Sequence, residues 1–126
     1  MKRYPKVLLH DHLDGGLRPE TIIEIADEIG YQGLPTKMSS KLADWFHEAA
    51  DSGTLERYLE TFNHTIAVMQ REKDIVRVAK EAVLDLAADG VIYAEVRVAP
   101  EHFTKKGLTT EAVTEAMLEG YRQGEI

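Results

Sequence analysis

Two histidines separated by one residue stand near the start of the chain, and the stretch from His10 to Gly16 reads His-Asp-His-Leu-Asp-Gly-Gly. They follow the apolar run Val7 to Leu9, so we expect a short buried strand over Lys6 to His10. Side chains alternate along a strand, and residues two apart therefore point to the same side. His10 and His12 would then present two imidazoles to one divalent cation, while Asp11 points away and is a poor shared ligand.

The position of this motif favours a functional site without proving one. Active sites of parallel α/β barrels form at the C-terminal ends of the strands, where His10 and His12 are expected. The alternative is that both are surface or partly buried histidines leading into an ordinary turn made by Asp14 and two glycines. Spacing alone leaves both interpretations open.

Composition excludes several classes of protein. The sequence has no cysteine, so disulfides and thiolate zinc sites are excluded, and a transition metal would need histidine, carboxylate or water. The formal net charge of -7 repels phosphate backbones and anionic membranes, so we expect no nucleic-acid and no membrane partner. The sequence contains no apolar run of membrane-spanning length and no signal-peptide core, and a cytoplasmic location is the simplest expectation.

Helical patterns dominate the chain. Pro19 suits the first position of a helix, Gly30 suits its end, and Ile22, Ala26 and Ile29 share one face. Further helices are expected over Ser39 to Ala50, Thr54 to Gln70, Lys73 to Ala88 and Thr109 to Arg122. The apolar face of the helix over Lys73 to Ala88 comprises Ile75, Ala79, Ala82, Val83 and Leu86.

A second strand is expected over Val91 to Val98, which is rich in β-branched residues and is followed by Pro100. Two strands separated by helices imply parallel pairing through a helical crossover. The predicted class is therefore α/β, mainly helical with two short parallel strands. Two such strands alone do not make a stable parallel sheet covered on both faces.

One further pattern lies on the helix expected over Thr54 to Gln70. Leu55, Tyr58, Leu59 and Phe62 have the spacing i, i+3, i+4 and i+7, which places them on one face. Such a stripe is usually plain core packing, and that interpretation stands beside a functional one.

Three segments of the chain resemble the adenosine deaminase family, in the same order and spacing. The first is His10 to Gly15 followed by Pro19-Glu20-Thr21, and the others are Leu55 to Phe62 and Tyr93 to Pro100. Three motifs in register are more specific than one. The resemblance implies that residues 1–126 are the N-terminal segment of a (β/α)8 TIM barrel domain of the amidohydrolase superfamily.

The resemblance also implies roles for individual residues. His10 and His12 correspond to two zinc ligands, His12 also borders the substrate, and Asp14 corresponds to the carboxylate that binds a ribose hydroxyl. The apolar face Leu55, Tyr58, Leu59 and Phe62 corresponds to a lid over the nucleoside pocket. The implied reaction is hydrolytic deamination of adenosine or deoxyadenosine to inosine and ammonia, with one Zn²⁺ per complete site. Adenine deaminases and other amidohydrolases share the histidine motif and remain the alternative within enzymes.

The rest of the site is not expected in this chain. A (β/α)8 barrel typically needs about 250 residues, and the family's third histidine ligand, aspartate ligand and glutamate proton shuttle would lie beyond Ile126. We therefore expect no catalytic residue here, no deamination by the isolated chain, and either self-association or pairing with the missing C-terminal barrel segment. A noncatalytic module is the alternative.

The other titratable residues are expected to have structural rather than catalytic roles. Glu95 and Arg97 lie on the same face of their strand and suggest a structural ion pair or a role behind the ligands. His47, His64 and His102 match no motif and are expected at the surface or in helix packing.

Overall fold

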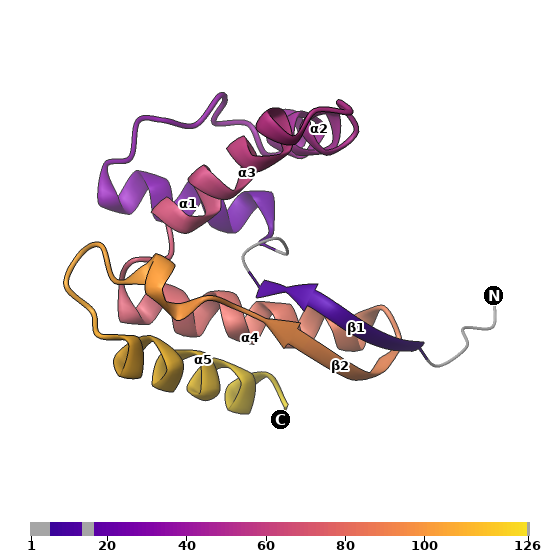
Figure 1. The fold of residues 1–126 in the computed structure, drawn as a ribbon, viewed down its shortest axis with the longest axis vertical. Helices are drawn as coiled ribbons and strands as arrows, with labels where there is room; N and C mark the ends of the chain where they lie inside the picture. The colour runs from indigo at the N-terminus through magenta and orange to yellow at the C-terminus, as the bar shows by residue number, and fades with distance from the viewer. Residues whose placement is uncertain (1–5, 14–16, 126) are drawn as a thin grey trace.

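The computed structural model describes residues 6–13 and 17–125, with the backbone alone described for residues 6–12, 92–95 and 97. Figure 1 shows the order of the elements along the chain. They are β1 (Lys6–His12), α1 (Pro19–Ile29), α2 (Ser39–Ala50), α3 (Leu55–Ala67), α4 (Glu72–Ala88), β2 (Val91–Arg97), the 3-10 helix η2 (Pro100–Phe103) and α5 (Thr110–Gly124).

The two strands pair in parallel, as the sequence predicted, with Lys6 opposite Val91 and His12 opposite Arg97. β1 continues to His12, two residues beyond the predicted end. The pairing shifts register between Leu8 and Asp11, and this shift includes His10. A register shift interrupts the regular alternation of side chains. The prediction that His10 and His12 leave the same side of β1 therefore stays a prediction.

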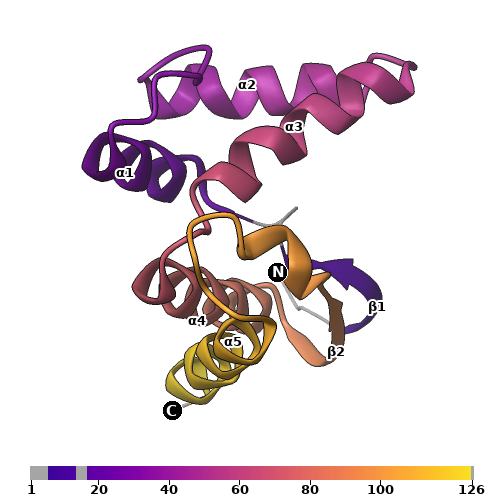
Figure 2. The ribbon, with the colours of Figure 1, turned by 60° about the vertical axis from the view of Figure 1, so that its left-hand side comes forward.

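The elements form two groups (Figures 1 and 2). The strand pair lies beside α4, α5 packs against α4, and we call β1, β2, α4, η2 and α5 the scaffold. The helices α1, α2 and α3 lie together on one side of it, and we call them the cap. The cap is inserted between β1 and α4. The chain leaves the scaffold after β1, forms the three cap helices, and returns to the scaffold at α4, which leads into β2.

The hydrophobic core joins the two groups. Ile22 and Ile25 of α1 are buried together with Ile75 and Val78 of α4, and Phe103 of η2 is fully buried beside them. The remaining buried members of this core are Leu13, Ala26, Leu42, Val68, Met69, Ala79, Val113, Ala116 and Met117. The sequence did not predict η2, whose single turn is too short to show helical periodicity.

One predicted core position is wrong. Ile29 was expected on the buried face of α1 but is 38% exposed, while Ile25 is fully buried. Ile29 is the last residue of α1, and Gly30 follows in the left-handed conformation at φ 73°. The Tyr31 amide then donates to the Ala26 carbonyl at 2.8 Å and closes the helix end. The chain turns away from the core at this point and leaves Ile29 at its edge.

The helices α4 and α5 pack at very close range because α5 carries glycine at two contact positions. A Cβ atom on Gly120 would collide with the Val76 carbonyl oxygen. A Cβ atom on Gly124 would lie 2.7 Å from Val83 Cβ. Only hydrogen fits between the two helices at these points, so the α4–α5 contact depends on glycine.

The predicted helix over Thr54 to Gln70 ends earlier than expected. α3 stops at Ala67, and the next three residues are buried. The Gln70 amide nitrogen donates to the carbonyls of Ile66 and His102, both at 2.9 Å, and its oxygen accepts from the Lys105 amide at 2.9 Å. This side chain ties the end of the cap to the segment around η2. In the described part of the chain, no helix is long and apolar enough to span a bilayer.

Candidate functional site

The predicted metal-binding motif lies where the scaffold meets the cap. β1 ends at His12, and Leu13 directly after it is buried at 1% exposure. The backbone therefore brings the motif to the C-terminal edge of the parallel strand pair, as the sequence predicted. The side chains of His10 and His12 are outside the described set, and Asp14 lies outside the described residues.

A cleft of about 410 Å³ lies between the three helices of the cap, and the start of α1, which follows β1 in the chain, supplies one of its walls. Its lining combines the first turn of α1 with facing residues of α2 and α3. The lining residues are Leu17, Pro19, Ile22, Ala43, Phe46, His47, Ala50, Tyr58, Thr61, Phe62 and Thr65. A mostly apolar wall with a few hydroxyl and imidazole groups is typical of sites for flat, partly polar small molecules.

The predicted lid face contributes directly to this cleft. Tyr58 and Phe62 are among the lining residues, with their rings 5.4 Å apart in an edge-to-face arrangement. Leu55 and Leu59 lie on the same face of α3, at 71% and 48% exposure. Within the described residues most of this face is exposed, so it is not packed into the core of this chain.

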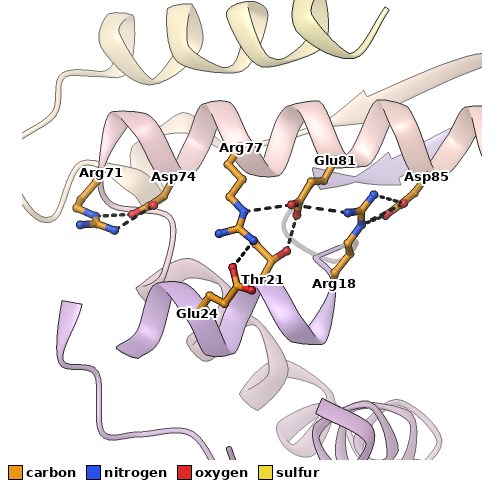
Figure 3. A network of polar contacts seen from close by, with 8 residues as sticks. All are labelled: Arg18, Thr21, Glu24, Arg71, Asp74, Arg77, Glu81 and Asp85. Carbon is orange, nitrogen blue, oxygen red and sulfur yellow. Dashed lines mark hydrogen bonds and ion pairs between the residues drawn. The ribbon is translucent and has the colours of Figure 1, made fainter. Parts of the chain in front are cut away.

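The first turn of α1 is held against α4 by polar side chains (Figure 3). Arg18 Nε donates to both carboxylate oxygens of Asp85, at 3.1 and 3.0 Å, and Arg18 Nη2 donates to Asp85 Oδ1 at 2.7 Å. The hydrogen bond to Asp85 raises the pKa of Arg18 above its ordinary value. The Thr21 hydroxyl donates to Glu81 Oε1 at 2.5 Å. These contacts fix the wall of the cleft that α1 supplies.

Sequence reasoning missed His47 as a cleft residue. It was assigned to the surface or to helix packing, and it is exposed, but it also lines the cleft opposite α3. A single histidine on a helix carries no motif, so only the three-dimensional arrangement of α2 and α3 identifies it. His102 is exposed on η2, in agreement with the prediction.

His64 packs inside the cap, as predicted. Its Nδ1 lies 2.9 Å from the Tyr31 hydroxyl, and its ring meets Trp45 edge-to-face with centroids 5.2 Å apart. Burial lowers the pKa of His64, and the nearby Glu60 carboxylate partly opposes this shift. The His64 ring, in contact with Tyr31 and Trp45, therefore joins the residue that follows α1 to α2 and α3.

A second cavity, of about 540 Å³, lies at the other end of α1 and is lined in part by Lys105, Lys106 and Gln70. The amide of Gln70 already has backbone partners at both its nitrogen and its oxygen. The Gln70 amide is thus already hydrogen-bonded within the protein and is not available to a ligand. The cleft in the cap is therefore the stronger candidate site.

Among the side chains that are described, no group of three or more histidine, cysteine or acidic residues is arranged to hold a metal ion. His10 and His12 do not belong to that set. The predicted contact between Glu95 and Arg97 also concerns side chains outside the description.

Comparison with known proteins identifies strong relatives over the same stretch. The adenosine deaminase 1 of Streptomyces coelicolor is 62% identical over 125 residues, which cover 99% of this chain and 32% of the relative. The adenosine deaminase of Mycobacterium ulcerans is 54% identical, with 99% of this chain and 34% of the relative covered. The chain thus spans about a third of the length of the curated relatives it matches.

Solved structures with a similar fold are also deaminases. An adenine deaminase from Arthrobacter aurescens superposes with a TM-score of 0.78 at 27% identity, covering 96% of this chain and 36% of that one. An N6-mAMP deaminase from Arabidopsis superposes with a TM-score of 0.71 at 28% identity, covering 94% and 34%. A sequence model described as adenosine deaminase matches residues 5–126. The chain therefore belongs to the adenosine deaminase family.

Proposed function

We propose that this chain supplies the N-terminal third of a (β/α)8 barrel enzyme that deaminates adenosine or deoxyadenosine to inosine and ammonia by zinc-dependent hydrolysis. The observation that carries the proposal is the 62% identity to an adenosine deaminase along 99% of the chain. The apolar face of α3 supports it, because Tyr58 and Phe62 of this face line the cleft and an apolar wall suits a flat base.

In this proposal, His10 and His12 hold zinc at the C-terminal end of β1, and His12 also borders the substrate. The donor chemistry fits the metal, since neutral imidazole is a common zinc ligand and the cysteine-free sequence offers no thiolate competitor. When bound, zinc supplies a water of lowered pKa for attack on the purine C6. No residue of this chain is proposed as the proton shuttle.

The remaining residues bind and shield the nucleoside. Asp14 accepts a hydrogen bond from a ribose hydroxyl, which fixes the sugar relative to the strand end. Leu55, Tyr58, Leu59 and Phe62 cover the base and exclude water from it. The aromatic pair Tyr58–Phe62 lies in the cleft wall, where a purine ring gains contact area without a polar penalty.

An adenine deaminase is the second candidate, because a structure of that activity superposes with a TM-score of 0.78. The two candidates differ in whether the pocket needs the ribose. Comparing kcat/KM for adenosine and for free adenine separates them. The proposal expects adenosine to be the better substrate, and the reverse preference contradicts it.

The metal assignment is tested in a chimaera that joins residues 1–126 in register to the C-terminal remainder of the Streptomyces coelicolor enzyme. Unsubstituted, it should contain about one zinc per chain and convert adenosine to inosine in an ultraviolet assay. His10→Ala with His12→Ala should remove the zinc by elemental analysis and abolish turnover. His102→Ala, on the exposed η2 turn, is the matched control and should retain both. A full zinc equivalent in the double variant would refute the ligand assignment.

A further inference from the structure

Neighbouring residues at the start of α1 contact different parts of the molecule. Leu17, Pro19 and Ile22 line the cleft. Arg18 and Thr21, between them in sequence, bind Asp85 and Glu81 of α4. The same short segment therefore lines the cleft and binds α4, so a displacement of the bound residues also displaces the wall of the cleft.

Glu81 is the centre of these contacts between the start of α1 and α4 (Figure 3). Its Oε1 accepts from Thr21, which is 1% exposed, and its Oε2 accepts from Arg77 Nε at 3.1 Å and lies 3.8 Å from Arg18 Nη1. Its side chain is only 15% exposed. A carboxylate removed from water in this way depends on its partners, and losing one of them is costly.

The helix that carries Glu81 belongs to the scaffold. α4 ends at Ala88, and β2 starts at Val91 after a short turn. β2 in turn pairs with β1 up to His12 opposite Arg97. Glu81 thus connects the cleft wall to the same frame that carries the proposed metal ligands.

We infer that Glu81, through Thr21 and Arg18, is a positioning residue that sets the distance between the α1 wall of the cleft and the strand ends, and thereby the affinity for substrate. It does not contact the substrate. The inference rests on the proposed function, since it assigns the cleft to the substrate of that reaction.

The chain offers a matched pair of substitutions for the test. Asp74 lies seven residues before Glu81 on α4, is also largely buried, and pairs with Arg71 at its own helix start. Glu81→Gln and Asp74→Asn both convert a carboxylate on α4 to an amide, but only Glu81 accepts from α1. In glutamine an amide nitrogen, which is a donor, replaces one of the two oxygens, so Thr21 and Arg77 no longer each donate to an oxygen of their own.

In the chimaera, Glu81→Gln should raise KM for adenosine on the order of threefold to tenfold with kcat changed by less than about twofold. Asp74→Asn should leave KM within about twofold of the unsubstituted value, even where its melting temperature falls as much as that of Glu81→Gln. A conservative Thr21→Ser should keep KM near the unsubstituted value, and Thr21→Val should raise it. Equal KM shifts in Glu81→Gln and Asp74→Asn, or no shift in Glu81→Gln, would overturn the inference.

A measurement independent of turnover keeps this test separate from the proposed function. Amide hydrogen–deuterium exchange over residues 17–22 should become faster in Glu81→Gln and stay unchanged in Asp74→Asn. An inactive but folded chimaera with this exchange pattern would reject the proposed function, and with it the effect on substrate affinity, while still showing that Glu81 holds the start of α1 in place. Unchanged exchange in Glu81→Gln rejects the positioning role whatever the activity.

Discussion

The two helix contacts of α4 are built in opposite ways. Toward α5, it makes a contact so close that glycine is required at Gly120 and Gly124. Toward α1, it reaches across with long polar side chains, such as Arg77, which donates to Glu24 Oε2 at 2.6 Å. The first contact depends on shape, whereas the second adds directed hydrogen bonds to the buried apolar residues that α1 and α4 share.

The two contacts of α4 therefore differ in which substitutions they tolerate. A contact without spare volume resists any added atom, since packed interiors have few voids to absorb it. A contact made by long side chains allows small adjustments of distance but depends on each donor and acceptor. The α4–α5 contact thus fixes the shape of the scaffold, whereas polar side chains hold the cap in place against α4. The apolar face of α3 remains exposed.

The largest expected effect is on the scaffold contact. Gly120→Ala in the chimaera should lower the free energy of unfolding by about 2 to 3 kcal/mol, because the added methyl meets backbone atoms of α4 that cannot rotate away. Chemical denaturation measures the change. Glu115→Ala, on the exposed side of α5, is the control and should stay within about 0.5 kcal/mol. An equally small effect at Gly120 would mean that α5 does not approach α4 so closely.

A smaller effect, on activity rather than stability, is expected in the cap. Leu59→Ala should lower kcat/KM for adenosine on the order of tenfold while changing the free energy of unfolding by less than about 1 kcal/mol, since half of the side chain is exposed. Leu84→Ala on α4 removes a leucine of similar exposure, 40%, from the scaffold. It should leave kcat/KM unchanged. Loss of activity in both variants would contradict the separate roles of cap and scaffold.

The smallest expected effect is the pH dependence of the cap. Burial holds the pKa of His64 below its ordinary value of about 6.5, so below that value the unfolded chain binds a proton that the folded chain resists. The free energy of unfolding should therefore fall as the pH drops below about 6.5 and recover as the pH rises above that value. His64→Gln should reduce the loss of melting temperature between about pH 7.5 and about pH 5.5. His102→Gln, at an exposed position, should keep the original slope.

Much of the fold was predictable from local pattern. The start of α1 at Pro19 and its end at Gly30 follow from the backbone preferences of those residues, and α2 begins and ends where the periodicity indicates. The end of α3 was not predictable, because Gln70 gains buried bonds to His102 and Lys105 that lie more than thirty residues away. Tertiary hydrogen bonds there outweigh the helical pattern.

The candidate site divides in the same way. The apolar face of α3 follows from spacing alone, but its openness depends on which elements pack against α3, and sequence spacing carries no such information. The anchoring role of Thr21 was equally hidden, since the sequence shows only a threonine after Pro19 and Glu20. Its partner Glu81 stands sixty residues later on another helix. Residues joined across that separation leave no short motif.

The parallel pairing of β1 and β2 has a consequence for the folding of the chain during its synthesis on the ribosome. Each residue of β1 pairs with one that is synthesised roughly 85 positions later. At about 5 to 20 residues per second, the first strand emerges roughly 4 to 17 seconds before its partner. The cap helices and α4 are all synthesised within that interval, before β2 is available to pair with β1. The strand that carries the histidine motif is thus synthesised before the strand that pairs with it, and during this interval its free edge is open to wrong strand partners.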